Sequence, residues 1–276
     1  MFFSEDLVFL QLQKTGGTHI AALLTEHLDG RMRGKHGPLD FDPGRRLVAG
    51  SVRNPWDWYV SLWAYGCADE GGVQGLLKSN RLKTAKYIAG RAGRQPELWR
   101  GALYDLISHM GRDVDFWRDV YADPYDPMRF RRWLRVVLSP EGRRLLGADY
   151  SLRSLAEFAG FYTYRFLSVF TPVEKWRKHA DDIRSPEDLD PFIDAHGAVQ
   201  MFIRTEFLED DLAEVFERIG RPEITAKVLK RARVNASKRG RVLSYYDDET
   251  LSLVGQAEDV VVERIGYVPP KTEIHS

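Results

Sequence analysis

The sequence predicts an α/β protein whose mostly parallel sheet is flanked by helices and carries a helical insertion. Two apolar runs, residues 7–12 and 47–52, have the length and composition of strands that are buried on both faces. Each run is followed within a few residues by apolar positions at helical spacing. Buried strands that alternate with helices are typical of parallel sheets, so these two units are expected to form the centre of the fold.

The first strand ends in a turn whose composition suits an anion. Lys14-Thr15-Gly16-Gly17-Thr18 ends the apolar run, and a helical pattern starts directly afterwards at Ile20. Amide groups at a helix start carry partial positive charge, glycines let a ligand approach the backbone, and Lys14 adds a full charge. We therefore expect a phosphate here. The motif is not a Walker A loop, because its lysine precedes the glycines. The alternative is a surface turn that only reverses the chain.

The second strand ends at Arg53-Asn54-Pro55. Asn54 suits the N-cap of a helix, Pro55 suits its first position, and Asp57 is favourable in the first turn. Arg53 is thereby predicted to lie at the carboxyl end of a strand, which is where open α/β sheets bind ligands. The two strand ends together offer Lys14 and Arg53 to one ligand.

The rest of the chain is interpreted as one domain over residues 1–276 with a helical insertion at 66–165. A short apolar run at 166–170 is interpreted as a return to the sheet, and 199–203 as a further strand that leads into a helix. A basic polar segment follows at 227–241, and a last helix is expected from Asp247 to Ile265.

Composition excludes several classes of protein. Lys+Arg and Asp+Glu balance at 40 each among 276 residues, so no overall field attracts nucleic acid. The single cysteine, Cys67, excludes an internal disulfide and a Cys-rich zinc site, and no metal-binding motif is present. No apolar run approaches the roughly 20 residues that span a bilayer, and the first residues lack the pattern of a signal peptide. We expect a soluble cytoplasmic protein without a membrane span.

Two stretches in order carry a family resemblance. Residues 13–18, Gln-Lys-Thr-Gly-Gly-Thr, and residues 52–61, Val-Arg-Asn-Pro-Trp-Asp-Trp-Tyr-Val-Ser, resemble the paired nucleotide signatures of sulfotransferases that use 3′-phosphoadenosine 5′-phosphosulfate (PAPS). The later stretches 203–208, 235–237 and 245–246 are similar to the carbohydrate branch, which includes heparan and chondroitin enzymes and their bacterial relatives. The resemblance implies a P-loop-like sheet. The resemblance covers both ends of the chain and does not extend to residues 66–165.

The resemblance also implies roles for individual residues. The 5′-phosphosulfate would be wrapped by Lys14, Thr15, Gly16, Gly17, Thr18 and His19, with Lys14 at the bridging oxygen. The 3′-phosphate would be held by Arg53 and Ser61, and the nucleotide would be covered by Lys238, Arg239 and Gly240. Two positions depart from the family pattern: Trp58 stands where arginine is frequent, and His19 where serine is commoner. Neither departure removes an expected phosphate contact, but Trp58 leaves one charge fewer near the nucleotide.

Sulfuryl transfer to a hydroxyl needs a base for the acceptor and positive charge near the leaving phosphate. His36 is our candidate base, because it lies in a glycine-flanked loop between the two phosphate-binding strands and histidine titrates near neutrality. A histidine in a similar place is the base in related 2-O-sulfotransferases. His36 as an ordinary loop histidine, His19 as the base and Glu206 as a carboxylate base remain alternatives. The chemistry implies no metal ion.

The insertion is expected to bind the acceptor, a hydroxyl compound and preferably a sugar. It contains aromatic residues that can stack on sugar rings, namely Trp99, Tyr104, Trp117, Tyr121, Tyr125 and Trp133, and an arginine group of Arg129, Arg131, Arg132, Arg135, Arg143 and Arg144. The alternative is a solvated helix face over core aromatics. Two other functions stay open for the chain: a P-loop-type kinase or NTP-using enzyme, and a non-catalytic nucleotide- or glycan-binding module.

Overall fold

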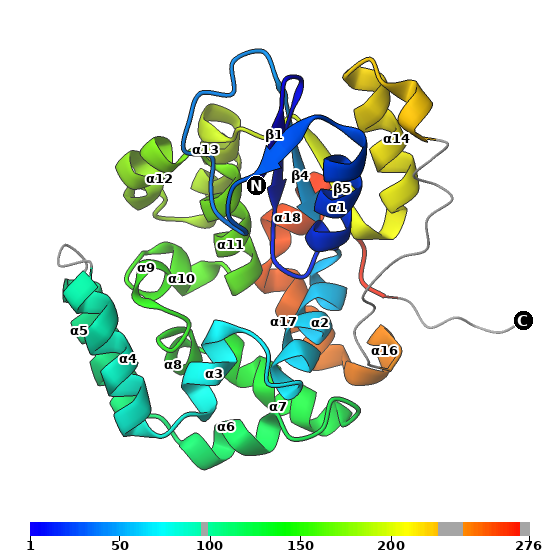
Figure 1. The fold of residues 1–276 in the computed structure, drawn as a ribbon. Coiled ribbons are helices and arrows are strands. Elements are labelled where there is room, and N and C mark those ends of the chain that lie inside the picture. Colours follow the sequence, from blue (N-terminus) through cyan, green and yellow to red (C-terminus); the bar gives the residue numbers. More distant parts are fainter. Residues whose placement is uncertain (95–98, 226–239, 271–276) are drawn as a thin grey trace, which may run out of the picture. The chain divides into compact units, whose positions relative to one another are not determined.

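The computed structural model describes residues 1–94, 99–225 and 240–270 (Figure 1). Among these residues the chain divides into two compact units. One consists of residues 1–58 and 165–225, and the other of 59–164 and 240–270. This division does not test whether the chain is one domain with an insertion at 66–165, which stays a prediction. No helix in the described ranges combines the length and the apolarity needed to cross a bilayer.

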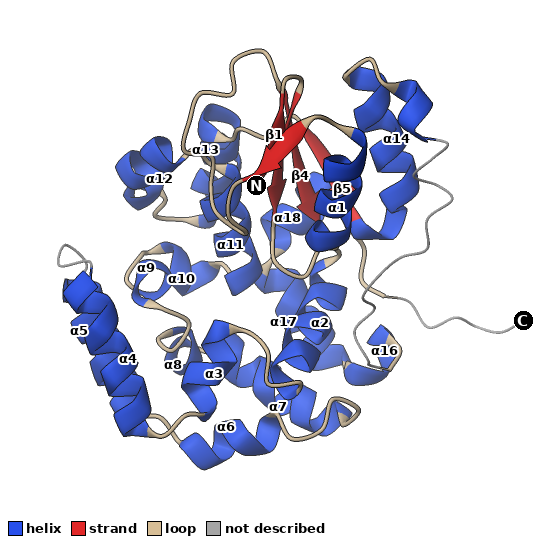
Figure 2. Ribbon diagram, in the orientation of Figure 1, coloured by secondary structure: helices blue, strands red, loops and turns tan. Residues whose placement is uncertain are grey.

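A five-stranded sheet forms the centre of the first unit (Figure 2). The strands are β1 (Phe2–Ser4), β2 (Leu7–Gln11), β3 (Gly30–Met32), β4 (Leu47–Val52) and β5 (Met201–Arg204), in the spatial order β3-β1-β2-β4-β5. Strands β2, β4 and β5 are parallel, whereas β1 is antiparallel to both β2 and β3. The protein is therefore α/β as expected, but its sheet is mixed rather than mostly parallel.

The difference from the expected sheet comes from β1 and β3, which the sequence analysis did not predict. Each has only three residues, so neither offers enough positions for a periodic pattern. Gly30 of β3 is required by packing, because a Cβ at this position would lie 2.3 Å from the Phe2 ring. The two strands extend the sheet beyond β2, on the side opposite β4.

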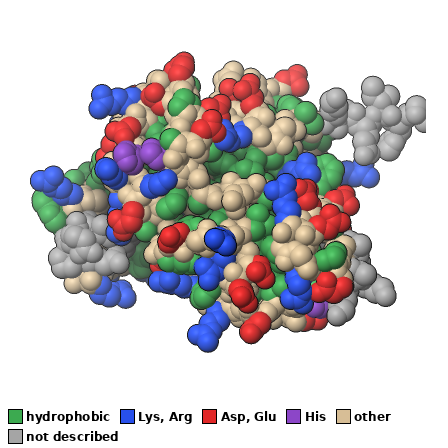
Figure 3. All heavy atoms as spheres, turned by 90° about the horizontal axis from the view of Figure 1, so that it is seen from above, with side chains coloured by type: hydrophobic (Ala, Val, Ile, Leu, Met, Phe, Trp, Pro, Cys, Tyr) green, Lys and Arg blue, Asp and Glu red, His purple; other side chains and the backbone are tan. Residues whose placement is uncertain are grey.

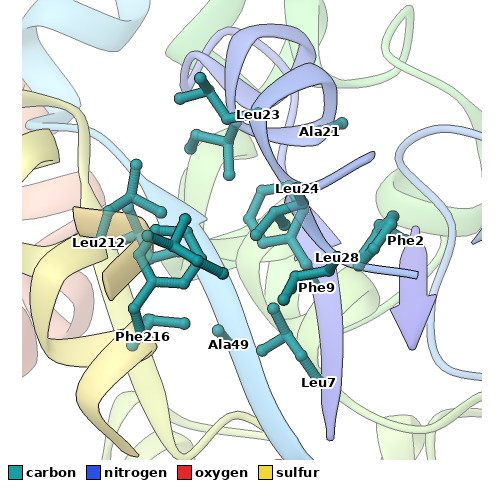
Figure 4. Close-up of a cluster of buried hydrophobic side chains, with 14 of the residues drawn as sticks. Phe2, Leu7, Phe9, Ala21, Leu23, Leu24, Leu28, Ala49, Leu212 and Phe216 are labelled. Carbon is teal, nitrogen blue, oxygen red and sulfur yellow. The ribbon is translucent and has the colours of Figure 1, made fainter. Parts of the chain in front are cut away.

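One face of the sheet is covered by α1 (Gly17–His27) and α14 (Leu208–Arg218). Figure 4 shows Leu7 and Phe9 of β2 packed with side chains from both helices. The cluster also contains Leu24 of α1 and Phe216 of α14, and all four side chains are fully buried. Because side chains alternate along a strand, the apolar stripe of each helix is matched by alternate positions of β2.

The other face of the sheet packs against α11 (Phe161–Phe170), where the sequence analysis predicted a strand at 166–170. That prediction is wrong. The rings of Phe166 and Phe170 lie 5.3 and 5.6 Å from the ring of Phe202 in β5. Gly50 of β4 makes room for this contact, since a Cβ there would lie 2.8 Å from Phe170. Almost every residue of α11 is buried, so the segment lacks the polar face that identifies a surface helix.

The remaining elements of the first unit are short helices that follow α11, β5 or α14 in the chain. They are α12 (Val173–His179), η2 (Ala180–Asp182), η3 (Pro186–Asp188), α13 (Leu189–His196), η4 (Thr205–Phe207) and η5 (Pro222–Ile224). Strand β5 starts two residues after the predicted strand start and is followed by the expected helix, α14. The boundaries between the two units fall inside α2 (Pro55–Cys67) and inside α11.

The second unit has helices and no strand among its described residues (Figure 2). Besides the second part of α2 and the first part of α11, its helices are α3 (Gly72–Lys78), α4 (Arg81–Arg94), α5 (Trp99–Met110), α6 (Val114–Val120), α7 (Pro127–Leu138), α8 (Pro140–Arg143), α9 (Ala148–Ser151), α10 (Leu155–Phe158), α16 (Val242–Tyr245), α17 (Asp248–Ala257) and α18 (Asp259–Ile265). The helical character expected for 66–165 is confirmed.

The last predicted helix is divided into α17 and α18 at Glu258. The Glu258 carboxylate is fully buried and accepts hydrogen bonds from the Tyr59 hydroxyl, from the Thr163 N–H at 2.7 Å and from the Thr163 hydroxyl at 2.7 Å. Burial raises the pKa of Glu258 to about 7. Gly160 is required beside it, because a Cβ there would lie 1.9 Å from Glu258 Oε1. The break thus places a carboxyl group in the core of the unit.

Candidate functional site: the strand ends of the first unit

The parallel strands place three predicted segments at one edge of the sheet. In the register, Gln11 of β2 lies opposite Ser51 of β4, and Val52 of β4 opposite Arg204 of β5. The carboxyl ends of β2, β4 and β5 therefore meet at the same edge, as the sequence analysis expected for the first two. The segments that follow these ends contain Lys14, Arg53 and Glu206.

The turn after β2 contains two left-handed residues and leads directly into a helix. Lys14 and Gly16 both adopt left-handed conformations, with φ of 65° and 72°, and α1 begins directly afterwards at Gly17. The N–H groups of Gly17 and Thr18 are the first two of the helix, a position that has no partner within a helix. Side chains are excluded at Gly17, where a Cβ would lie 2.7 Å from the Gln11 side chain. The turn therefore leads into a helix N-terminus of the kind that attracts negative charge.

Thr15 ties this turn to the sheet. Its hydroxyl donates to the Leu12 carbonyl at 2.7 Å and lies 2.7 Å from the Ser51 hydroxyl. Because the Thr15 hydroxyl has one hydrogen, Ser51 must be the donor between the two hydroxyls. Both side chains are fully buried. The Thr15 hydroxyl is therefore part of the support of the turn, and only its backbone remains a candidate for phosphate contact.

Arg53 lies against the same turn. Its Nη1 donates to the Lys14 carbonyl at 3.0 Å, while Nε and Nη2 contact Asp57 Oδ2 at 2.7 and 2.6 Å. Asp57 lies in the first turn of α2, four residues after Arg53, so the ion pair fixes the guanidinium at the start of that helix. The structure therefore brings together Lys14 and Arg53, which the sequence analysis assigned to one ligand from separate motifs.

Trp58 stands where the sulfotransferase pattern frequently has arginine, and its contacts show what the tryptophan does in this protein. Its indole N–H donates to the Gln13 carbonyl at 2.6 Å, and the side chain is fully buried. An arginine at this position would bring a charge, whereas the tryptophan fastens the residue next to Lys14 by a neutral hydrogen bond. Trp58 therefore serves the geometry of the turn.

His36 lies beside the same turn, on a loop with left-handed backbone (φ 58°). Its Nδ1 is 3.2 Å from the Gln11 carbonyl oxygen. Because a carbonyl only accepts, Nδ1 carries the proton and the neutral ring has its lone pair on Nε2. Burial lowers the pKa of His36, and the positive charge of Arg165 lowers this pKa further, although the bond to Gln11 opposes both effects. The neutral form that a general base needs is therefore favoured.

Arg165 joins the His36 loop to the turn after β2. Its Nε donates to Gln13 Oε1 at 3.1 Å and its Nη2 donates to the His36 carbonyl at 3.1 Å. Arg165 was not among the predicted site residues, because it precedes a run that was interpreted as a strand. The only signal for Arg165 in the sequence is its position as a single charged residue within the aromatic segment 161–170.

Glu206 lies at the end of β5 and contacts the start of α2. Its Oε1 accepts a hydrogen bond from the Asn54 N–H at 2.9 Å, while the Asn54 side chain accepts from the Trp56 N–H at 3.1 Å. The predicted N-cap role of Asn54 is thus confirmed. Desolvation of the carboxyl group raises the pKa of Glu206, although the residue keeps much of its surface exposed. Glu206 remains an alternative base.

The other expected ligand residues are distributed over the chain. His19 lies half-buried in the first turn of α1, and its N–H donates to the Gly16 carbonyl at 2.9 Å. Ser61 belongs to the part of α2 in the second unit and is fully buried. Gly240, also in the second unit, donates its N–H to the Tyr245 hydroxyl at 2.8 Å. Lys238 and Arg239 lie outside the described residues.

No family model, curated protein or solved structure matches this chain. Among the described residues, no group of three or more His, Cys, Asp or Glu side chains is arranged to hold a metal ion.

Seen from above (Figure 3), Lys and Arg side chains are interspersed with Asp and Glu side chains, in keeping with the balanced composition.

The expected acceptor-binding arginines are largely engaged by carboxylates of the second unit. Asp119 lies 2.7 Å from Arg129 and 2.6 Å from Arg132, and Glu249 lies 2.7 Å from Arg135. Three of the expected stacking aromatics, Trp117, Tyr121 and Trp133, are buried, whereas Trp99 and Tyr125 are exposed. These contacts favour the alternative of a paired helix face over core aromatics. The acceptor-binding role of 66–165 stays a prediction.

Proposed function

We propose that the protein is a PAPS-dependent sulfotransferase that transfers a sulfuryl group to a hydroxyl, preferably of a carbohydrate. The observation that carries this proposal is the contact of Arg53 with the Lys14 carbonyl, since it joins the two segments that resemble the nucleotide signatures of sulfotransferases. The parallel order of β2, β4 and β5 supports a P-loop-like arrangement around these segments.

The residues at the strand ends suit a donor with two separate anionic groups. The first amides of α1 and the Lys14 ammonium supply positive charge for a 5′-phosphosulfate, and a guanidinium suits a phosphate because it offers paired donors. In this proposal Arg53 binds the 3′-phosphate. Asp57 limits the freedom of its guanidinium, so less conformational entropy is lost when the phosphate binds.

The proposed reaction is an in-line displacement at sulfur. The acceptor hydroxyl oxygen forms a bond to sulfur, and the bond from sulfur to the 5′-phosphate oxygen of the donor breaks. His36 Nε2 takes the acceptor proton, while Lys14 stabilises the negative charge on the departing 3′-phosphoadenosine 5′-phosphate. His19 and Glu206 are the alternative bases. The charge to be stabilised falls on a phosphate that Lys14 can contact, so the proposal requires no metal ion.

The decisive experiment is incubation with labelled PAPS and a panel of oligosaccharides and small alcohols, followed by mass spectrometry. A product heavier by one sulfuryl group would support the proposal. Binding of 3′-phosphoadenosine 5′-phosphate should be much tighter than binding of AMP, and equal binding would count against a 3′-phosphate site. Competition by ATP with Mg²⁺ would favour an NTP-using enzyme. Slow solvolysis of PAPS, with no transfer to any acceptor, would favour a non-catalytic module.

A further inference from the structure

Helix α5 of the second unit exposes an apolar stripe. Trp99, Leu103, Ile107 and Met110 follow one another at spacings of four, four and three residues, which places them on one face of the helix. Their exposed fractions lie between 43% and 66%. Four large apolar side chains that share a face are expected to point into a protein core, yet these four point to solvent.

The stripe is distinct from the face that packs within the unit. His109 of α5 is buried, and Gly101 lies so close to α9 that a Cβ would be 3.2 Å from the Ala148 side chain. Helix α4 lies beside α5 (Figure 1) and adds Leu82 and Tyr87 as further exposed apolar residues. The α4–α5 pair, defined as these two helices, therefore has a core-facing side and a separate exposed apolar stripe.

The same two helices also expose basic side chains. Lys83 and Lys86 of α4 and Arg100 of α5 are exposed, and no described carboxylate forms an ion pair with any of them. The Arg100 guanidinium lies 5.5 Å from the centre of the Trp99 ring, so charge and apolar surface are adjacent. The arginines of α7, in contrast, are matched by acidic residues.

We propose that the α4–α5 pair docks on an anionic phospholipid surface. Exposed Trp, Leu and Ile on one helix together with basic residues nearby form the combination that binds at the interface of anionic membranes. The helices would lie in the plane of the interface, so neither needs the length to span it. A second copy of the chain is a poor occupant, because it would bring the same unmatched lysines against these. The proposal does not depend on the activity at the strand ends.

Vesicle binding tests the proposal with matched variants. The full chain should co-sediment with vesicles of phosphatidylcholine and phosphatidylglycerol at 70:30, and should stay in solution with phosphatidylcholine alone. Ile107→Glu should weaken binding by at least about tenfold, because it places a charge in the apolar stripe. The control is Leu152→Glu, which alters a similarly exposed apolar residue of the same unit and should bind normally.

The charge contribution is tested in the same way. Lys83→Glu with Lys86→Glu should abolish co-sedimentation, and raised salt should weaken wild-type binding. Lys175→Glu with Lys178→Glu is the matched control, because these exposed lysines of α12 have the same spacing and lie in the other unit. An equal loss of co-sedimentation in the two double variants would show that the total charge of the protein governs binding. That result would overturn the proposal.

The fluorescence of Trp99 can report contact between α5 and lipid directly. Among the protein's seven tryptophans it alone is exposed, since the other six have exposed fractions of 6% or less. Brominated anionic lipid should quench part of the fluorescence, and Trp99→Phe should remove that quenchable part. Absence of quenching, binding to neutral vesicles alone, or a dimer that dissociates in Ile107→Glu would each overturn the proposal, the last in favour of a second copy.

Discussion

The Arg53 guanidinium donates a hydrogen bond to the Lys14 carbonyl, across a separation of 39 residues in the chain. Arg53 follows β4 and Lys14 follows β2, which are adjacent and parallel. The contact means that Arg53 acts both as a cation and as a brace for the turn that carries Lys14. Replacing Arg53 should therefore affect both its own ligand contact and the position of the turn.

Arg53→Ala should weaken binding of 3′-phosphoadenosine 5′-phosphate by about 10- to 100-fold, as expected for the loss of charge-assisted hydrogen bonds. Arg53→Lys should recover only part of the lost affinity, because an ammonium group lacks the paired, coplanar N–H donors of a guanidinium. Isothermal titration calorimetry measures both variants. The control is Arg218→Ala, which removes an arginine of the same unit that also pairs with a carboxylate four residues away. Similar losses in Arg53→Ala and Arg218→Ala would contradict a site at Arg53.

Thr15→Val should destabilise the protein by about 1–3 kcal/mol, because the Leu12 carbonyl and the Ser51 hydroxyl lose their buried partner. Urea unfolding measures the change. Thr18→Val is the matched control, since Thr18 is exposed in the same turn and should change stability little. If the two variants were equally stable, Thr15 would not be the link between the turn and the sheet.

His36→Ala should leave binding of 3′-phosphoadenosine 5′-phosphate intact and lower turnover by about 10²–10⁴-fold, the usual contribution of a general base. Because burial lowers the pKa of His36, the base stays neutral at and above its ordinary pKa of about 6.5. The wild-type kcat/KM should accordingly be constant above that pH and fall only below it. His179→Ala is the control histidine. Undiminished turnover in His36→Ala would direct attention to Glu206 or His19.

Arg165→Gln tests how the His36 loop is positioned. Removing the positive charge should raise the pKa of His36, because this charge lowers it in the wild type. Proton NMR titration of the His36 ring should therefore show a midpoint at higher pH, and the acidic limb of kcat/KM should move in the same direction. An unchanged midpoint would mean that Arg165 does not act on His36. The matched control is Arg184→Gln.

Glu258 makes stability depend on pH in the second unit. Its pKa is about 7 in the folded protein against an ordinary value of 4.5, so the folded state holds more protons between these values. Stability should therefore decrease as the pH rises from 4.5 to 7, by about 3 kcal/mol at most, and should then level off. Urea unfolding of Glu258→Gln should lack this contribution. Glu263→Gln, an exposed change on α18, should retain it, and identical profiles for the two variants would contradict the assignment.

Local sequence patterns were sufficient to predict the strands and helix starts that carry the candidate site. Residues 7–12 and 47–52 predicted β2 and β4, because a strand buried on both faces needs a continuous apolar run. The glycine turn and Asn54-Pro55 predicted the starts of α1 and α2, because the chemistry of helix termini depends on neighbouring residues. Lys14 and Arg53 could therefore be assigned to one edge of the sheet.

Tertiary contacts decided the elements for which local patterns were ambiguous. Phe166 and Phe170 belong to a helix that is buried on almost all sides, and such a helix has the same apolar character as a short strand. The three-residue strands β1 and β3 depend on pairing with other strands, so their own residues contain little signal. Charge balance on α7 likewise depends on Asp119 and Glu249, which the sequence does not place near its arginines.

The sequence by itself determined the chemical groups of the candidate site: a glycine turn with Lys14, an arginine after the next strand and a loop histidine. Only the tertiary structure decided how they are held, because Thr15, Trp58 and Arg165 act through hydrogen bonds to residues distant in the chain. A hydrogen bond between two such residues depends on the packing of whole elements. The pattern of neighbouring residues therefore identifies the candidate groups, and the fold brings them together.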